Sequence, residues 1–469
     1  MEWLNWNSIT SYLRSSLGYH ILLEAFLLLI VVYLMFLRKK KSRRPAKLSE
    51  KEKQLLIDEW KPEPLAPDIP SDHYALNPKI VTSKYGKHII VDGKKCLNLA
   101  THNYLGLSDE KSLEDAALNG LRKYGVGSCG PRGFYGTVDI HLELESRLAK
   151  FLNVEEVILY SYGLSAVASA IPAYAKKGDV IFCDEGVHFA IQKGLTASRS
   201  TIKYFKHNDV DDLHRLLIEQ EKFDNKNPKL ARVIRRFLVV EALYMNYGDI
   251  CPLREMMELK KKYKVRIFVD ETVSFGVLGE HGKGITEHLN IPIEDIDHIS
   301  STLEHAISGY GGFCAGTTFI IDHQRLSGLG YCFSASLPPL QVAVAIAALD
   351  MLENKPDLTE KLRSNCINMH QKLSRLLSCR VHGDPISPVK HLRFSKELSS
   401  YDVETEQLEK ICDHAHQKGF ALAISRYLDE EVLKNRPSIR LLINASLEET
   451  ELTEICDVIG EAFDKFIIL

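Results

Sequence analysis

The chain has 469 residues, 45% hydrophobic and 26% charged, a composition compatible with a large packed core and about two domains. Its net charge of −3 hides an asymmetry, because the run Arg38 to Arg44 carries six positive charges and leaves about −9 for the rest. An acidic body argues against nucleic-acid binding, which requires a basic face. Ten cysteines without a CxxC pair or metal-ligand spacing favour free, buried thiols in a reducing compartment and indicate no metal site.

The N-terminal part is expected to anchor the chain in a membrane. Residues 17–37 form an apolar stretch of about the length that one bilayer crossing needs. A buried core helix is the alternative, but the adjoining basic run favours a span, and a cleaved signal peptide lacks its small-residue site. The basic run places everything after it in the cytosol and leaves residues 1–16 as a lumenal tail. Glu24 is costly in lipid, so we expect it to face a partner helix or the headgroups.

Residues 38–75 read as a linker between this anchor and the body. The basic run comes first, and a short amphipathic segment follows at Lys51 to Trp60, which either lies on the membrane or docks on the body. Pro62 to Pro70 holds four prolines and predicts a stiff extended segment rather than a helix or a central strand.

The body is expected to be α/β, with a large domain at 76–339 and a small one at 340–469. Four short runs are apolar on both faces and alternate with helical patterns: Val157 to Tyr160, Val180 to Cys183, Phe237 to Glu241 and Arg266 to Asp270. This alternation predicts a mainly parallel sheet covered on both sides, with ligands at the carboxyl ends of its strands. After a long helical stretch from Leu340 to about Leu377, weaker strands and a C-terminal helix predict a smaller α+β domain.

A set of motifs indicates the chemistry of the body. The glycine-rich stretch YGVGSCGPRGFYGT begins at Tyr124, and NYLGL precedes it at Asn103; later come VVEALYMNYGDICPL, FVDETVSFGVLGEHGKG and YCFSASLPP. In this order they resemble the α-oxoamine synthases, pyridoxal-phosphate enzymes of fold type I that condense an amino acid with an acyl-CoA. Within that family, the anchor and the particular residues of the motifs are similar to those of the subunit 1 group of serine palmitoyltransferases.

The resemblance also shows where the catalytic residues differ. The family holds its cofactor as a Schiff base on the lysine of T-F-S-K-A-x-G-x-x-G-G, and the matching segment here, which begins at Thr302, has His305 at that position. Asp270 matches the carboxylate that pairs with the pyridine nitrogen, and His188 the histidine that stacks on the ring. Val273 and Met245 stand where the family has a histidine and a serine. His188 and Asp270 are therefore expected to be a vestigial cofactor site that holds no cofactor.

Members of the family are dimers with active sites at the subunit interface, so one chain can complete the other's pocket. The residues expected to contribute to the partner's site are Cys129, Gly130, Arg132, Tyr135, Ser334 and Ser336. The alternative, equally open, is that both segments only pack the interface. Arg440 matches the family's arginine for the substrate carboxylate and is expected to be vestigial.

The resemblance implies a non-catalytic, anchoring and regulatory subunit that pairs with a lysine-bearing catalytic subunit of the subunit 2 or 3 type. That partner would bind pyridoxal phosphate covalently and condense L-serine with palmitoyl-CoA to 3-ketosphinganine, the first step of sphingolipid synthesis, at the endoplasmic reticulum membrane. Small membrane regulators could meet the anchor near Glu24. Two other hypotheses are an independent acyltransferase that uses another lysine, such as Lys193 or Lys283, and a membrane scaffold unrelated to lipid synthesis.

Overall fold

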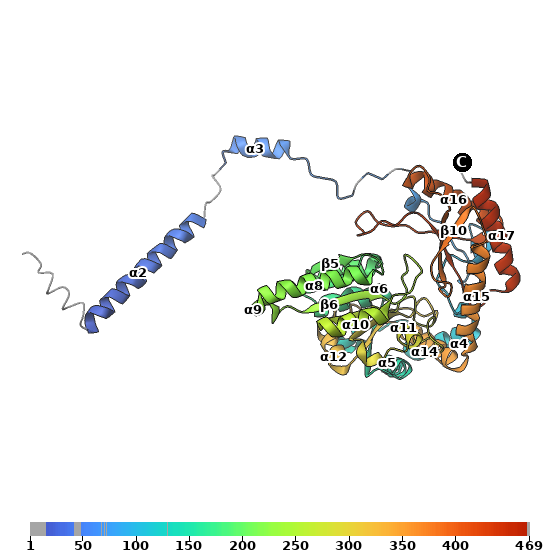
Figure 1. Cartoon of the computed structure of the whole chain (residues 1–469), viewed down its shortest axis with the longest axis horizontal. Helices are drawn as coiled ribbons and strands as arrows, with labels where there is room; N and C mark the ends of the chain where they lie inside the picture. The colour runs from blue at the N-terminus through green and yellow to red at the C-terminus, as the bar shows by residue number, and fades with distance from the viewer. Residues whose placement is uncertain are drawn as a thin grey trace, which may run out of the picture. The chain divides into compact units, whose positions relative to one another are not determined.

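A computed structural model describes residues 16–41, 48–66, 68–69, 71, 73–128 and 130–466 of the chain (Figure 1). The chain divides into two compact units, Met1–Pro78 and Lys79–Leu469.

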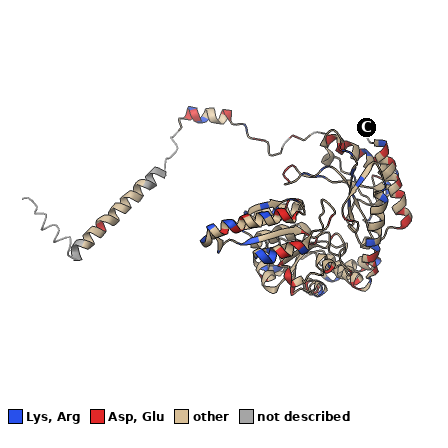
Figure 2. Cartoon of the chain, viewed as in Figure 1, with Lys and Arg blue, Asp and Glu red and all other residues tan. Residues whose placement is uncertain are grey.

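The first unit contains a long apolar helix, α2 (Ser16–Lys41). Its window Tyr19–Phe36 has a mean hydropathy of 2.2 and none of it is buried, and it is the one helix in the described part of the chain with the length and composition to cross a membrane. Glu24 is the only charged residue in that window (Figure 2). The predicted apolar helix at 17–37 is thus confirmed.

A second helix of this unit, α3 (Glu50–Glu59), begins at a capping box. The backbone N–H of Glu52 donates to the Ser49 hydroxyl at 3.2 Å, and the Ser49 N–H donates to the Glu52 carboxylate at 2.7 Å. These two bonds satisfy amides that a helix end otherwise leaves unpaired. No residue of α3 is buried, and a single 3-10 turn, η1 (Tyr74–Leu76), follows.

The second unit is built on a seven-stranded sheet of order β3-β9-β8-β7-β6-β4-β5. All neighbours are parallel except β9, which runs antiparallel to both β3 and β8. The strands are β3 (Glu156–Tyr160), β4 (Val180–Asp184), β5 (Thr201–Phe205), β6 (Arg236–Glu241), β7 (Arg266–Asp270), β8 (His298–Thr302) and β9 (Gly312–Gly316). The predicted mainly parallel α/β sheet is confirmed. Its central strands are buried, as expected for sequences that are apolar on both faces.

Helices connect these strands and cover the sheet (Figure 1). They are α4 (Lys111–Tyr124), α5 (Asp139–Leu152), α6 (Gly163–Tyr174), α7 (Phe189–Ser198), α8 (Val210–Lys226), α9 (Pro228–Ala231), α10 (Leu253–Tyr263), α11 (Ile285–Leu289), α12 (Thr318–Ser327) and α13 (Leu329–Cys332). Short turns lie between them at η2 (Leu107–Asp109), η3 (Arg132–Gly136) and η4 (Ile293–Asp295). In the view of Figure 2, acidic and basic residues are interspersed over this unit.

The helical stretch predicted from Leu340 is two helices, α14 (Pro339–Asn354) and α15 (Asp357–Leu373). The break falls at Lys355, whose φ of −128° and ψ of 71° are not helical, directly before Pro356. A proline disfavours the helical conformation of the residue that precedes it, so the chain turns there.

The C-terminal part contains two further sheets. One is antiparallel, of order β10-β11-β14-β13, and the other has the order β1-β2-β12. Their elements are β10 (Cys379–His382), β11 (Val389–Phe394), β13 (Ala423–Ile424), β14 (Ile439–Leu442), β1 (His88–Val91), β2 (Lys94–Asn98) and β12 (Phe420–Ala421), with helices α16 (Tyr401–Gln417) and α17 (Glu449–Phe466). Because β2 pairs with β12, the start of the body joins its C-terminal part. The domain boundary at residue 339 stays a prediction.

A buried ionic cluster fixes the loop that follows β4. His207 donates from Nδ1 to Asp184 at 2.9 Å and contacts Asp249 with Nε2 at 3.0 Å. The second Asp184 oxygen accepts from the Asn208 N–H at 2.8 Å, and the first also accepts from the Gly186 N–H at 2.7 Å. Burial opposes protonation of His207, but hydrogen bonds to the two carboxylates outweigh it and raise its pKa to about 9. An imidazolium therefore holds this loop, which leads directly into His188.

This cluster predicts a pH-dependent stability. The pKa of His207 is higher in the folded than in the unfolded protein. The contribution of His207 to the free energy of unfolding is therefore complete below its unfolded pKa of about 6.5 and is lost as the pH rises through its folded pKa of about 9. A rise of this size corresponds to roughly 3 kcal/mol. We expect His207→Gln to lower the free energy of unfolding by up to that amount at pH 6 and by much less at pH 10, as measured by denaturant unfolding in detergent. His214→Gln, which removes a histidine hydrogen-bonded to Tyr263, is the control.

Candidate functional site

A cavity of about 170 Å³ lies at the carboxyl ends of the parallel strands. Its wall combines residues that follow β4, β6, β7 and β8 with the first residues of α6. The lining residues are Gly163, Leu164, Val167, His188, Ala190, Met245, Thr272, Thr302, Glu304 and His305. Ligand sites of open α/β sheets lie at this edge, so the position agrees with the one predicted from the sequence.

Two carboxylates, Glu241 and Asp270, end adjacent strands beside this cavity. The register of β6 against β7 pairs these two residues directly, and both are almost fully buried. His188 lies against them: its backbone N–H donates to Glu241 at 2.6 Å, and its ring Nε2 is 3.5 Å from the Asp270 carboxylate. The other ring nitrogen, Nδ1, accepts a hydrogen bond from the Ala190 N–H at 3.2 Å.

The charges of these three groups are coupled. Burial opposes protonation of His188, but the carboxylates of Glu241 and Asp270 outweigh it and raise the His188 pKa to about 9. Burial likewise opposes ionisation of Asp270, whose pKa is nevertheless lowered by contacts with His188 and Thr272. Burial raises the pKa of Glu241 to about 7. The Nδ1 of His188 accepts a hydrogen bond from the Ala190 N–H at 3.2 Å, which leaves the ring proton on Nε2, toward Asp270.

His305 is a neutral imidazole fixed in place by its neighbours. Its Nδ1–H donates to the carbonyl of Thr272 at 3.1 Å, and its ring stacks on that of His102 with centroids 3.9 Å apart. Burial, together with the positive charge of Arg440, lowers the pKa of His305 to about 4. A neutral, stacked imidazole has no amine with which to form a Schiff base.

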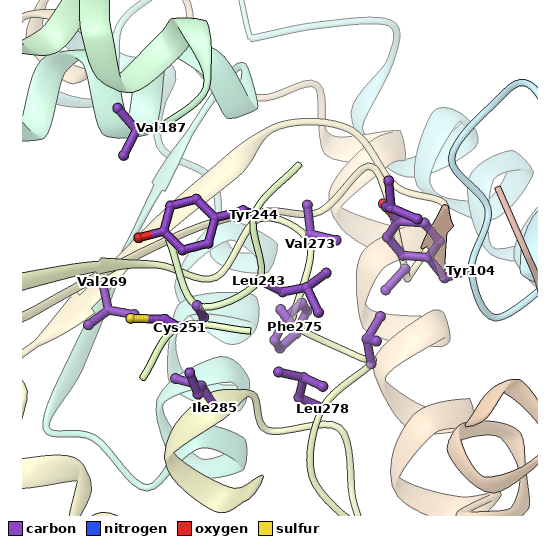
Figure 3. Close-up of a cluster of buried hydrophobic side chains, with 14 of the residues drawn as sticks. Tyr104, Val187, Leu243, Tyr244, Cys251, Val269, Val273, Phe275, Leu278 and Ile285 are labelled. Carbon is purple, nitrogen blue, oxygen red and sulfur yellow. The ribbon is translucent and has the colours of Figure 1, made fainter. Parts of the chain in front are cut away.

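The two other substituted positions are apolar in the structure as well. Met245 lines the cavity; its N–H donates to Glu241 at 2.9 Å and its carbonyl accepts from His391 at 2.9 Å. Val273 is 1% exposed and belongs to the same buried cluster as Leu243 and Phe275 (Figure 3). Neither side chain offers a hydrogen bond to a ligand oxygen.

No lysine lines the cavity among the described residues. Lys193 forms an ion pair with Glu430 at 2.8 Å, and the ammonium of Lys283 lies over the ring of Phe151 at 5.6 Å. The two lysines considered from the sequence therefore have other partners.

Glu304 is a cavity residue that the sequence reasoning did not single out. Its carboxylate accepts a hydrogen bond at 3.2 Å from the N–H of Gly163, the first residue of α6. The family motif T-F-S-K has a serine at this position, so the motif already showed that Glu304 is a substitution. Its partner Gly163 is distant in sequence, so the contact itself could not be read from the motif.

Arg440, on β14, is half-buried and carries no ion pair or side-chain hydrogen bond to the described residues. Burial is the main cause of the lowered pKa values of His305 and His102, and the charge of Arg440 lowers them further. The site thus combines an unpaired guanidinium with two histidines that burial keeps neutral.

The structure joins the glycine-rich loop to the segment around Ser336. The Ser336 N–H donates to the carbonyl of Gly130 at 3.0 Å, and its hydroxyl contacts the Ser128 hydroxyl at 2.5 Å and the Gly136 carbonyl at 2.5 Å. Ser334 donates to the carbonyl of Gly330. The two segments predicted to serve the partner's site therefore form one local structure, although Cys129 lies outside the described residues.

Within this loop, Arg132 and Tyr135 point in different directions. Arg132 is buried and forms two hydrogen bonds with Glu145, at 2.8 and 3.0 Å, and a third with Thr137. Tyr135 has a φ of 63° and its side chain is 102% exposed. A non-glycine residue in this conformation is strained, a feature that is common in binding segments. Arg132 is thus bound within its own chain, and Tyr135 is the residue that the loop presents outward.

The side chains of the cavity do not fit a covalently held pyridoxal phosphate. The amine is replaced by His305, the groups at Met245 and Val273 cannot donate hydrogen bonds, and Asp270 already faces the ring of His188. Glu304 adds a carboxylate where a phosphorylated ligand would meet like charge.

Comparison with known proteins agrees with this geometry. Residues 94–459 match the family profile of the class I and II aminotransferases. The long chain base biosynthesis protein 1 of Arabidopsis thaliana is 44% identical over 92% of this chain and 89% of its own length. Serine palmitoyltransferase 1 of Dictyostelium discoideum is 39% identical over 97% of this chain and 96% of its own, and the Saccharomyces cerevisiae protein of that name is 33% identical over 97% and 91%.

Solved structures support the same assignment. A structure of SPT with a PLP internal aldimine is 25% identical, with a TM-score of 0.74 over 83% of this chain and 93% of its own. The serine palmitoyltransferase of Sphingomonas wittichii is 26% identical, with a TM-score of 0.74 over 83% and 92%. The chain therefore belongs to the serine palmitoyltransferase 1 family, which also bears the name long chain base biosynthesis protein 1 and is built on the class I and II aminotransferase fold.

Proposed function

We propose that this chain is the non-catalytic subunit of a heteromeric serine palmitoyltransferase, which anchors, stabilises and completes a lysine-bearing catalytic partner. That partner would hold pyridoxal phosphate covalently and condense L-serine with palmitoyl-CoA to 3-ketosphinganine. The observation that carries the proposal is His305, which stands at the lysine position as a neutral imidazole bound to the Thr272 carbonyl. The names of the relatives supply the reaction.

The alternative of an independent acyltransferase finds little support in the site. It requires another lysine to reach the cavity, but Lys193 is paired with Glu430 and Lys283 lies over Phe151. It also requires hydrogen-bond donors at the positions of Met245 and Val273, which are apolar. A membrane scaffold without a tie to lipid synthesis would leave the family membership unexplained.

An exposed aromatic surface supports the pairing with a partner subunit. It joins η3, the start of α6, α12 and α13, which pack against one another. Its exposed apolar members are Val126, Phe134, Tyr135, Tyr162, Leu164, Tyr310, Phe319, Leu326, Leu329 and Phe333. Aromatic side chains are enriched at protein interfaces, and a large exposed apolar patch marks a docking site. Leu164 also lines the cavity, so a subunit bound here would lie beside the site.

The membrane part of the proposal rests on α2 and the basic run after it. A single span in the endoplasmic reticulum, with the N-terminus in the lumen, puts the Lys79–Leu469 unit in the cytosol. Glu24 lies inside the apolar window, where a charge is costly in lipid. Small membrane regulators of the complex are therefore proposed to contact α2 near this residue.

The proposed division of labour predicts that activity requires two chains. Purified alone, this chain should give no serine-dependent release of CoA from palmitoyl-CoA, because no lysine is among the described residues that line its cavity. Co-expression with a lysine-bearing subunit should give a detergent-stable complex with full turnover. Replacing the partner's lysine by alanine should abolish turnover, whereas His305→Ala in this chain should lower it by less than about tenfold. Turnover by this chain alone at the rate of the complex would contradict the proposal.

The exposed aromatic surface predicts that assembly and stability can be separated. Tyr135→Ala removes a side chain without contacts in its own fold, so the thermal midpoint of the isolated chain should stay unchanged. Interface aromatics often contribute about 2 kcal/mol or more, so the dissociation constant of the complex should rise on the order of tenfold. Leu377→Ala, at an equally exposed leucine outside this surface, is the matched control and should bind the partner normally. Equal affinities for the two variants would remove Tyr135 from the interface.

The proposed topology predicts where glycans attach. An acceptor sequence placed before Leu17, in an extended tail, should be glycosylated in endoplasmic reticulum membranes, and one placed near Trp60 should not. The natural sequon at Asn444 should also stay unmodified; its buried side chain accepts hydrogen bonds from Ser446. Endoglycosidase digestion followed by a gel-mobility assay reads out each site. The opposite pattern would invert the orientation.

A further inference from the structure

A helix N-terminus facing the cavity is already bound to an anion of the chain itself. Helix α6 spans Gly163–Tyr174, and its N-cap residue Tyr162 makes no side-chain capping bond. The N–H of Gly163 instead donates to the carboxylate of Glu304, at 3.2 Å. The exposed N–H groups and the dipole at such an end favour phosphates and carboxylates alike, so the two compete for this position.

The geometry around Glu304 holds its carboxylate at that end of the helix. The Glu304 N–H donates to the Thr302 hydroxyl at 3.2 Å, and that hydroxyl donates to the Gly311 carbonyl at 3.0 Å. A Cβ on Gly163 would lie 2.5 Å from the Thr302 hydroxyl, so the absent side chain permits the approach. Gly163, Thr302 and Glu304 all line the cavity.

A second contact in the same cavity has the opposite sign. The ring of His188 lies 3.5 Å from Asp270, and its Nδ1 accepts a hydrogen bond from the Ala190 N–H at 3.2 Å, so its Nε2 faces a carboxylate that a cationic ligand would otherwise contact. The chain thus places its own ring nitrogen against Asp270 and its own anion against α6. No lysine or arginine is among the described residues that line the cavity.

We infer that Glu304 is a built-in anion that occupies the N-terminus of α6 and thereby prevents phosphorylated ligands from binding in this chain's cavity. The inference rests on the proposed function, in which this chain carries no cofactor, and it assigns the exclusion to a residue other than the one at the lysine position. His305 removes the covalent attachment, and Glu304 removes the site for the phosphate.

The test uses the complete complex and a ligand that forms no covalent bond. Borohydride first fixes the cofactor on the partner and closes that site. Equilibrium dialysis against pyridoxine 5′-phosphate, which lacks the aldehyde, then measures binding by fluorescence for the wild type, Glu304→Gln and Glu304→Ser. Dialysis against pyridoxine without phosphate separates recognition of the phosphate from recognition of the ring.

Glu155 provides the matched control. Its carboxylate accepts from the Thr318 N–H at 2.7 Å at the start of α12, so Glu155→Gln removes the same charge from another helix end outside the cavity. Two unit charges about 4 Å apart near a protein surface repel strongly, so the Glu304 variants should bind pyridoxine phosphate on the order of tenfold or more tightly than the wild type. Pyridoxine should show no such gain, and Glu155→Gln should behave like the wild type.

Several results would overturn the inference. Glu304 variants that bind no more tightly than Glu155→Gln would show that Glu304 does not exclude phosphate. An equal gain for pyridoxine would show a general opening of the cavity instead. Serine condensation, measured on complexes that were not treated with borohydride, depends on the partner's site and tests the proposed function independently. A negative dialysis result with normal two-chain activity would thus discard the role of Glu304 alone.

Discussion

The site depends on two buried carboxylates that the sheet forces side by side. The register of β6 against β7 pairs Glu241 with Asp270, and burying two such groups without a counter-charge would be costly. His188 contacts both, with its backbone N–H bound to Glu241 and its ring Nε2 beside Asp270, and burial raises the pKa of Glu241 to about 7. The loop that carries His188 is itself fixed by the Asp184–His207–Asp249 cluster. A neighbouring ionic cluster thus sets the position of the ring between the two carboxylates.

These contacts satisfy the buried groups without an amine at the lysine position. Asp270 is contacted by the ring of His188 from within the chain. His305 needs only a hydrogen-bond acceptor and a stacking partner, which Thr272 and His102 provide. The groups around the cavity are therefore largely satisfied by one another, with Arg440 as the main exception.

Much of the architecture could be predicted because it rests on local patterns. Strands such as Val180 to Cys183 are apolar on both faces, which indicates a parallel sheet, and the ordered motifs indicate the family and the substitution at His305. The pairing of β2 with β12 could not be predicted, because it joins segments more than 300 residues apart that carry no shared signal. The break between α14 and α15 could have been found from Pro356, but the strong helical pattern on both sides concealed it.

The site residues divide in the same way. Motif positions predicted which residues gather at the cavity, including His188, Met245 and His305. They did not predict side-chain direction: Arg132 turns inward to Glu145, while its neighbour Tyr135 faces outward. Glu304 was missed because its role comes from Gly163, 141 residues earlier in the chain. Contacts of this kind depend on how β8 and α6 meet in space, which no local pattern encodes.

The central claim is that this chain holds no covalent cofactor while its partner does. The most direct measurement is intact mass spectrometry of both chains after the purified complex is saturated with pyridoxal phosphate and reduced with borohydride. The account predicts one pyridoxyl group per pair of chains, carried entirely by the lysine-bearing partner, with the mass of this chain unchanged. A stoichiometric pyridoxyl group on any lysine of this chain would contradict it.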